Sequence, residues 1–344
     1  MQQRYLFFIG IDISKKWFDA AFTMEGEKEQ MYHERFDNTK QGFQALLKAL
    51  RAWSKRRKLD GTFLFCMEHT GVYTYPICHF LQSKQLAFVL VSGLEIRYSL
   101  GIRRGKNDAQ DSRDIARYAH LKRKKLIAST LPLQELMLLK HLLAYRNRLV
   151  KYKNGLKVAA GELKSFAPTS EAKLVVQDSQ AVTKHLQQKI EQTEHRIRQT
   201  IRQEDQLEPL FVLATSVKSV GLIIGATLLV YTNAFTAFSN VRKFACYCGI
   251  APFGETSGTS VNKPARVHAL GYRKIKALLS NAAQSAINHD AEIKAYYRRK
   301  IAEGKHEGKH EGKVVNAIKF KILARVFATV KRGTPFVERN TFMT

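Results

Sequence analysis

The sequence predicts an α/β domain with a mixed sheet, then two long helices, then a mainly helical third region. Three observations support this order. Residues 5–92 alternate short apolar runs with segments of helical periodicity, residues 142–201 carry apolar residues at heptad spacing, and the chain beyond Pro209 returns to short helical patterns. We therefore expect three domains, at residues 1–130, 131–208 and 209–344.

The first domain begins with a strand over residues 5–11, because YLFFIGI is an almost continuous apolar run that suits a strand buried on both faces. Its last helix covers residues 107–122, where Asn107 can act as the N-cap and acidic residues concentrate in the first two turns. Between them we expect strands at 17–24 and 30–36, a helix at 42–59, a strand at 62–68, a helix at 73–84 and a strand at 86–92.

An apolar pattern that alternates three and four residues over four heptads indicates a coiled coil in the middle of the chain. One row of this seam contains Leu142, Leu149, Leu156 and Leu163, and the other contains Tyr145, Tyr152, Ala159 and Phe166. A second helix, over about residues 171–206, carries one apolar stripe made of Val182, Leu186, Ile190, Ile197 and Ile201. Such helices form a hairpin within one chain or pack against another chain, and the sequence leaves both open.

The third region contains an apolar segment at residues 219–229, SVGLIIGATLL, in which Gly221 and Gly225 mark a tight turn into a helix. This pattern resembles a helix-hairpin-helix, whose backbone amides contact phosphate, and simple helix packing explains the glycines nearly as well. The apolar centre is about half as long as a membrane span. We therefore expect a buried helix here.

Basic residues outnumber acidic ones by about two to one: 57 Lys and Arg against 29 Asp and Glu, for a net charge of +28 and a pI near 10.0. Such an excess repels itself unless a polyanion neutralises it, and nucleic acid is the commonest polyanion partner. A membrane partner would need an amphipathic basic helix or an apolar span, and neither pattern stands out. The N-terminus lacks a signal-peptide pattern and four cysteines suggest no disulfide framework, so we expect a cytoplasmic protein.

Four acidic residues occupy positions that the α/β domain can bring together. Asp12 follows the first strand and Glu68 ends the fourth, so their carboxylates are neighbours if these two strands pair. Asp108 and Asp111 are three residues apart on one predicted helix and share a face. Converging carboxylates repel one another unless divalent cations neutralise them, and oxygen ligands of this kind select Mg²⁺ or Mn²⁺. The quartet is typical of a two-metal site that holds a scissile phosphate.

Other acidic residues fit this site less well, and we set aside Asp19, Asp60 and Asp114. A separate segment, Gly254-Glu255-Thr256-Ser257-Gly258, reads as a polar loop about 150 residues later. A Ser beside Gly in such a loop is usually a turn residue, and the neighbouring hydroxyls of Thr256 and Ser260 are not excluded by spacing.

Six segments resemble the DEDD transposases of the insertion sequence 110 family. GIDISK (10–15), MEHTGVY (67–73) and KNDAQDSRDIA (106–116) resemble the family's RuvC-like, ribonuclease H-like domain. GIAPFGETSG (249–258), LGYRKIKALLSNAA (270–283) and GKVVNAIKFKILARVFATVKRGTPF (312–336) resemble its second domain. The resemblance extends over nearly the whole chain. It departs at Gly271-Tyr272, where the family usually has Gly-Asn, and at Lys276, where it often has Arg.

The resemblance implies site-specific DNA recombination guided by a structured noncoding RNA of the bridge-RNA type, which pairs with donor and target DNA. It implies that Asp12, Glu68, Asp108 and Asp111 bind the metal ions and that Ser257 is the nucleophile. The serine then forms a phosphoserine link to DNA and frees a 3′-hydroxyl, which permits rejoining without a nucleotide cofactor. It further implies a homo-oligomer, a dimer or a tetramer, in the prokaryotic cytosol or nucleoid, whose composite site joins the metal domain of one subunit to the serine domain of another.

Several basic residues crowd around the serine segment, and we expect them to contact the DNA backbone: Lys263, Arg266, His268, Arg273 and Lys274. Two other functions remain open. One is a metal-dependent RuvC-like nuclease or junction resolvase in which Ser257 is structural, and the other is a nucleic-acid-binding protein without catalysis.

Overall fold

The computed structural model describes residues 5–24, 31–58, 61–69, 71–100, 107–166, 169–257, 261–267, 271–304 and 310–338, with only the backbone for 253–257, 261–266 and 310. The chain folds as two compact units, unit 1 (Met1–Leu131) and unit 2 (Pro132–Thr344).

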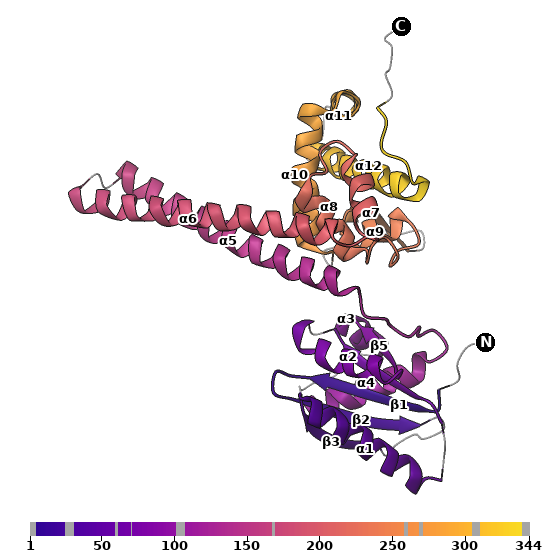
Figure 1. Cartoon of the computed structure of the whole chain (residues 1–344). Coiled ribbons are helices and arrows are strands. Elements are labelled where there is room, and N and C mark those ends of the chain that lie inside the picture. The colour runs from indigo at the N-terminus through magenta and orange to yellow at the C-terminus, as the bar shows by residue number, and fades with distance from the viewer. Residues whose placement is uncertain are drawn as a thin grey trace. The chain divides into compact units, whose positions relative to one another are not determined.

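Unit 1 contains a mixed sheet whose strands are β1 (Phe7–Ile13), β2 (Trp17–Met24), β3 (Tyr32–Asp37), β4 (Phe63–Glu68) and β5 (Ala87–Val91) (Figure 1). Their order in the sheet is β3-β2-β1-β4-β5. β1 and β2 pair antiparallel, as do β2 and β3, whereas β1–β4 and β4–β5 are parallel pairs. The first and fourth strands are therefore neighbours, which is the pairing on which the predicted carboxylate site depends.

Helices cover both faces of this sheet. One face packs against α1 (Lys40–Arg56) and α2 (Tyr75–Ser83), and the other packs against α4 (Asp108–Lys122). A 3₁₀ turn (Gly71–Tyr73) precedes α2, and α3 (Gly93–Leu100) is a short helix that the sequence patterns did not predict. The mixed α/β architecture expected for the N-terminal region is confirmed.

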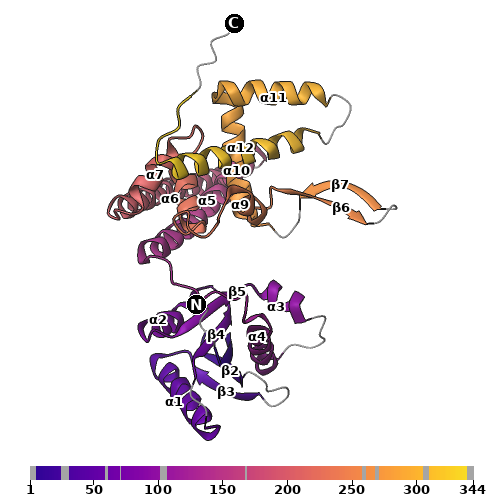
Figure 2. The ribbon, with the colours of Figure 1, turned by 90° about the vertical axis from the view of Figure 1, so that its right-hand side faces the viewer.

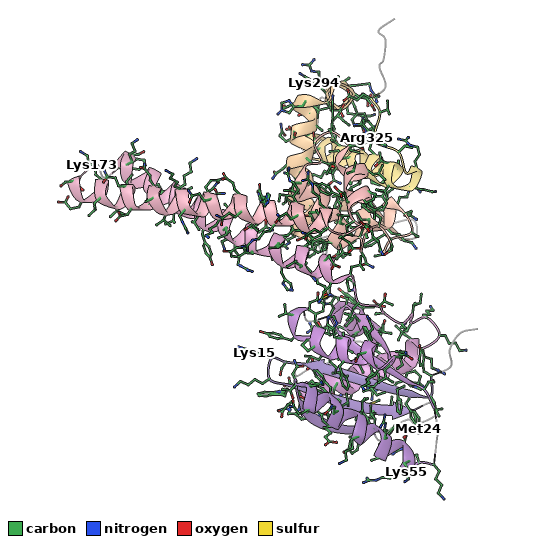
Figure 3. The ribbon with its side chains drawn as sticks, in the orientation of Figure 1. Lys15, Met24, Lys55, Lys173, Lys294 and Arg325 are labelled. Atoms are coloured by element: carbon green, nitrogen blue, oxygen red, sulfur yellow. The ribbon has the colours of Figure 1, made fainter. Side chains whose placement is uncertain are left out.

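Unit 2 begins with two long helices, α5 (Gln134–Phe166) and α6 (Ser170–Arg202), which fold back on each other as a hairpin within the chain (Figure 1). Thr169 caps α6, because its hydroxyl accepts a hydrogen bond from the backbone N–H of Ala172 at 3.2 Å. Figure 3 labels Lys173 near the end of the hairpin where the two helices turn.

The predicted seam is right in one row and wrong in the other. Of the leucine row, Leu149 is buried and the others are half-buried, whereas Tyr152 and Phe166 are 60% and 87% exposed. In the structure, the second row of the seam instead contains the residues one position later, Arg146, Lys153 and Ala160. Arg146 bonds Glu194 at 2.6 Å and Lys153 bonds Gln187 at 2.9 Å across the hairpin. The pattern missed these positions because Lys and Arg bury their aliphatic stems while their charged heads find partners.

The rest of unit 2 is mainly helical, with one two-stranded ribbon: α7 (Glu208–Thr215), α8 (Leu222–Tyr231), α9 (Val241–Tyr247), β6 (Pro252–Ser257), β7 (Val261–Val267), α10 (Arg273–His289), α11 (Ala291–Glu303) and α12 (His310–Arg332). Arg325 of α12, labelled in Figure 3, pairs at 2.6 Å with Asp290, which also caps α11. Gly225 allows α8 to approach α7, since a Cβ there would lie 2.8 Å from Phe211 and Thr215. Within the described ranges, no helix is long and apolar enough to cross a membrane.

Candidate active site

Helix α4 lies in direct backbone contact with β1, and a glycine makes this possible. A Cβ on Gly10 would fall 2.1 Å from the backbone nitrogen of Ala116 and 2.2 Å from the carbonyl oxygen of Ser112, so only glycine fits. Asp12 is two residues further along β1 and therefore points to the same face of the sheet. The sequence thus places Asp12 beneath the helix that carries the other two aspartates.

The first turn of α4 is fixed by its cap. The Asn107 side chain accepts a hydrogen bond from the backbone N–H of Ala109 at 3.0 Å, so the helix begins at Asp108. This confirms the predicted cap. Asp108 and Asp111 then occupy the first turn, where the positive end of the helix dipole favours carboxylates.

Glu68 reaches the same edge of the sheet from the next strand. It is the last residue of β4, which runs parallel to β1, so both strands deliver a carboxylate at their carboxyl ends. Gly93, at the start of α3, leaves room for the Glu68 side chain. A Cβ at Gly93 would come within 2.1 Å of Glu68 Oε1.

The charges of the other three carboxylates all act on Asp12. Burial raises the pKa of Asp12 from 3.8 to about 6, with further increases from the charges of Asp111, Asp108, Glu68 and Asp19. The predicted quartet is therefore brought together, although its catalytic role stays a prediction.

The quartet forms an open cluster. In the part of the chain that the structure describes, no three His, Cys, Asp or Glu side chains stand close enough together to enclose a metal ion. The donor set nevertheless fits a hard divalent cation, because it offers only carboxylate oxygens. Like charges add to the effect of burial on the pKa of Asp12, and a bound cation would relieve that repulsion.

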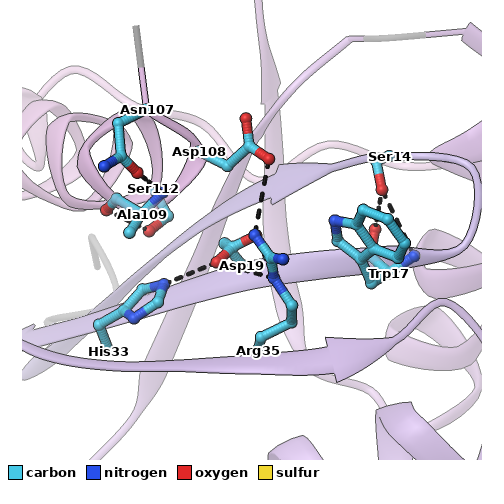
Figure 4. A network of polar contacts seen from close by, with 9 residues as sticks. All are labelled: Ser14, Trp17, Asp19, His33, Arg35, Asn107, Asp108, Ala109 and Ser112. Carbon is cyan, nitrogen blue, oxygen red and sulfur yellow. Dashed lines mark hydrogen bonds and ion pairs between the residues drawn. The ribbon is translucent and has the colours of Figure 1, made fainter.

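An ion network centred on the buried Asp19 borders the cluster on the β2–β3 side (Figure 4). Asp19 lies opposite Asp12 in the β1–β2 register and is only 1% exposed. His33 Nε2 lies 2.8 Å from Asp19 Oδ1, and Arg35 donates to Asp19 Oδ2 from Nε at 3.1 Å and Nη2 at 2.9 Å. The same Nη2 is 3.6 Å from Asp108 Oδ2, so a fixed positive charge stands beside the quartet.

The sequence analysis missed this network, since it set Asp19 aside and did not consider Arg35 or His33. A signal was present, because a carboxylate inside a buried strand needs partners, and a following strand with alternating polar residues can supply them. Asp114 is used elsewhere, accepting from Gln110 at 3.0 Å and pairing with Arg117 at 3.5 Å. Asp60 lies outside the described residues.

Ser257 belongs to a strand, which corrects the expectation that residues 254–258 form a loop. β6 pairs antiparallel with β7 and ends at Ser257, opposite Val261, with a register irregularity between Phe253 and Glu255. Figure 2 shows the two strands extending as a ribbon from the helices of unit 2. Hydrogen bonding between the strands, which sequence periodicity did not reveal, holds the backbone of the Gly-rich segment extended.

The base of this ribbon is anchored by glycine contact and aromatic stacking. Gly249 has φ +67°, and a Cβ there would lie 2.7 Å from Gly271 Cα, so the two ends of the ribbon cross closely. The rings of Tyr247 and Tyr272 stack with centroids 5.8 Å apart, and the Tyr272 hydroxyl is 2.6 Å from that of Tyr231. Burial raises the pKa of Tyr247 to about 12, with a smaller contribution from the charge of the neighbouring Tyr272.

The predicted nucleic-acid contacts are distributed around this base. Lys263 and Arg266 lie on β7, and His268 lies outside the described residues. Arg273 and Lys274 are exposed in the first turn of α10, where the positive helix end disfavours cations. An external anion would stabilise that arrangement.

Comparison with known proteins gives a consistent result over both units. Residues 9–163 match the model of the DEDD transposases of insertion sequence 110, described as "Transposase", and residues 212–298 match "Transposase IS116/IS110/IS902 family". The chain belongs to the insertion sequence 110 transposase family. This transposase therefore acts on DNA and rearranges it enzymatically, and transposases of this type generally use a divalent metal ion.

Two kinds of relatives resemble the transposase. The pilin gene-inverting proteins of Moraxella bovis and Moraxella lacunata are each 25% identical over 338 residues, which is 96% of this chain and 98% of theirs. The insertion element IS110 43.6 kDa protein of Streptomyces coelicolor is 30% identical over 131 residues, 38% of this chain and 31% of that protein.

Proposed function

We propose that this transposase is an RNA-guided serine recombinase that cuts and rejoins DNA with the help of Mg²⁺ or Mn²⁺. The observation that carries the proposal is the carboxylate cluster of unit 1, in which acids of β4 and α4 add to the rise in the pKa of Asp12 on β1. On this proposal residues 1–130 are a RuvC-like metal domain, 131–208 a coiled coil, and 209–344 the serine domain, including the helix-hairpin-helix-like segment.

The relatives support recombination over simple hydrolysis. The Moraxella proteins invert a pilin gene, as their name says, and they match nearly the whole of this chain. Inversion rejoins every strand that it breaks. An enzyme of this kind must therefore retain the energy of each broken phosphodiester bond, and a covalent protein–DNA ester is one way to do so.

Asp12, Glu68, Asp108 and Asp111 are the residues that would hold the divalent cations. Cations held there would supply positive charge to stabilise the negative charge on the phosphate oxygens in the transition state. The chain's own part is to fix these oxygens on rigid supports. Two carboxylates stand at the ends of neighbouring parallel strands, and two stand in the capped first turn of α4.

Ser257 supplies the nucleophile in this proposal. Its Oγ forms a bond to a DNA phosphorus as the bond from that phosphorus to the 3′-oxygen breaks, and the proton of the serine hydroxyl passes through solvent to the 3′-oxygen. Reversal with a different 3′-hydroxyl rejoins the strand and restores the serine. The segment lies inside the second matched region of the family, which supports this assignment.

RNA guidance and oligomerisation complete the proposal. In RNA-guided systems base pairing reads the sequence while the protein binds backbone and shape, which suits a chain of net charge +28. The proposed dimer or tetramer is supported by one flank of α5, where Tyr145, Tyr152 and Phe166 are exposed at heptad spacing.

A Ser257→Ala variant tests the chemistry. Full-length wild-type protein, incubated with Mg²⁺, its co-purified RNA and an end-labelled duplex spanning the element junction, should give a labelled protein–DNA adduct that survives denaturing electrophoresis. The variant should give neither adduct nor product. Continued cutting by the variant would favour the metal-dependent nuclease instead. Thr256→Val, a neighbouring hydroxyl change, serves as the matched control and should keep the adduct.

An Asp12→Ala variant and RNA sequencing test the other parts. Loss of the Asp12 carboxylate should abolish product while the protein remains folded and DNA-bound, whereas unchanged excision would favour a binding protein without catalysis. A discrete, foldable noncoding transcript from beside the reading frame should co-purify with the protein. Recovery of only random cellular RNA would remove RNA guidance from the proposal.

A further inference from the structure

A basic groove lies at the edge of unit 1, away from the carboxylates. It has a volume of about 580 Å³. Trp53 and Arg56 of α1 and the cap residue Arg57 line one side, Arg113 and Arg117 of α4 line the other, and Tyr32 of the edge strand β3 lies between them. No acidic residue lines its described part. The groove therefore concentrates four guanidinium groups where an anion can enter.

The four arginines differ in the ion pairs that they form with the described residues. Arg56 and Arg113 form no ion pair within the described ranges, whereas Arg117 is 3.5 Å from Asp114 and the Arg57 guanidinium lies 4.3 Å from the centre of the Trp53 ring. Unpaired arginines that converge on one groove repel each other. Phosphate oxygens, which guanidinium binds in a bidentate manner, would remove that repulsion.

The indole of Trp53 gives an independent sign of a missing acceptor. Trp53 is only 5% exposed and lines the groove, yet its Nε1–H has no acceptor among the described residues. Buried N–H groups almost always have a hydrogen-bond partner. The described residues therefore leave this N–H of a groove-lining residue without its acceptor.

The groove and the carboxylate site share α4, and the groove lies further along that helix without including the carboxylates. Asp108 and Asp111 occupy the first turn, and Arg117 lies nine residues, about 13 Å, further along the same helix. At 3.4 Å of rise per nucleotide, this spacing corresponds to roughly four nucleotides of a DNA strand. Along β3 the same direction leads from Arg35, beside Asp108, to Tyr32 in the groove.

We propose that this groove binds the phosphates of the DNA strand that is cut at the carboxylate quartet, about four nucleotides from the scissile phosphate. The inference rests on the proposed function, because it takes the quartet as the place of cutting. Arg56 and Arg113 contact phosphate oxygens from opposite walls, and Arg57 stacked on Trp53 forms the floor. Binding of this kind positions the strand and carries no sequence information.

The test compares two double variants that remove the same charge from full-length protein. Arg56→Gln with Arg113→Gln neutralises the groove, and Arg51→Gln with Lys55→Gln neutralises exposed residues of α1 that do not line it. Figure 3 labels Lys55 at the end of α1. Binding of a labelled duplex that spans the element junction is measured by fluorescence anisotropy over a range of salt concentrations.

The groove variant should bind this duplex about 10- to 100-fold more weakly, and its salt slope should fall by about two, as expected for two lost phosphate contacts. The control should stay within about threefold of the wild type. Arg56→Lys with Arg113→Lys keeps both charges and should restore the slope, which separates charge loss from misfolding. Equal losses in the groove variant and its control would overturn the proposal.

A neutral methylphosphonate in the DNA locates the contact. Placed about four nucleotides from the cut, it should weaken binding of the wild type and leave the groove variant unaffected, whereas a more distant one should weaken both equally. Loss of binding to the co-purified RNA with unchanged DNA binding would assign the groove to RNA and sink the proposal. These readouts use binding alone, so they stay separate from Asp12→Ala, whose unchanged excision would refute the proposed function.

Discussion

The two faces of the unit 1 sheet differ in what they contribute. Along β1, Phe7, Ile9 and Ile11 point toward α1 and α2 and are fully buried in an apolar core. The alternate residues, Phe8, Gly10 and Asp12, face α4 and become more polar toward the end of the strand. One face of the same strand therefore provides stability, while the other holds acidic groups whose repulsion lowers it.

This difference explains why the candidate site can tolerate mutual repulsion. Burial, with a further contribution from like charges, raises the pKa of Asp12 to about 6, and a carboxyl raised in this way destabilises the folded state at neutral pH. Burial of the side chains on the opposite face offsets that loss. We expect substitutions on the α1 face to change stability alone, and substitutions on the α4 face to change activity more than stability.

The largest effect is expected from Gly10→Ala. The added methyl group would collide with the backbone of α4, which cannot move without carrying Asp108 and Asp111 with it. We expect a loss of about 3 kcal/mol in the free energy of unfolding, measured in urea, and no detectable DNA product. Gly155→Ala, where a Cβ meets no atom within 4 Å, is the control and should keep wild-type activity. Wild-type activity in Gly10→Ala would contradict the close contact.

Leu46→Ala tests the apolar face. Leu46 of α1 is fully buried in the core of that face. Its truncation should lower the free energy of unfolding by about 3 kcal/mol through lost burial and a cavity. Recombination by the folded protein, assayed well below its melting temperature, should not change. If product formation fell together with stability, the two faces would not be independent.

Gly93→Ala tests the carboxylate site, whose substitution should change activity more than stability. The new methyl group would displace the Glu68 carboxylate, which is the flexible end of a side chain, so stability should change by less than about 1 kcal/mol. The rate of DNA cutting should fall about 100-fold, because displacements near 1 Å are that costly at reacting groups. Thermal melting and single-turnover rates measure the two effects. A Glu68→Gln variant should be at least as impaired.

The smallest effect concerns pH. A carboxyl whose pKa is raised from 3.8 to about 6 in the folded protein lowers stability once the unfolded chain ionises, and the penalty is complete above pH 6. The Asp12→Asn substitution removes this penalty. In EDTA, we expect the variant to be more stable at pH 7.5 by about 1 kcal/mol, after allowance for screening of this partly exposed group, and equal near pH 4.

The matched control for this experiment is Asp178→Asn, which changes an exposed residue of α6. Its stability difference from the wild type should not vary with pH over the same window. Addition of Mg²⁺ should raise the melting temperature of the wild type and not that of Asp12→Asn. A pH-independent difference for Asp12→Asn would show that its carboxyl is not perturbed by its neighbours.

Local patterns in the amino-acid sequence were enough to predict several features. The strands of unit 1 and its helices other than α3 follow from apolar periodicity, and the start of α4 follows from Asn107. Asp12 and Glu68 were identifiable because each closes an apolar run. The leucine row of the hairpin was predictable for the same reason, since a heptad repeat is a local property of one helix.

The contacts between residues of different strands and helices became visible only in the tertiary structure. Asp19 joins the site through its register with Asp12, and Arg35 reaches Asp108 from an edge strand. The second row of the seam, with Arg146 and Lys153, depends on partners that α6 places opposite them. The Ser257 segment is extended because β7 pairs with it. In each case the decisive contact joins residues of two different elements, and the pattern within one element does not record it.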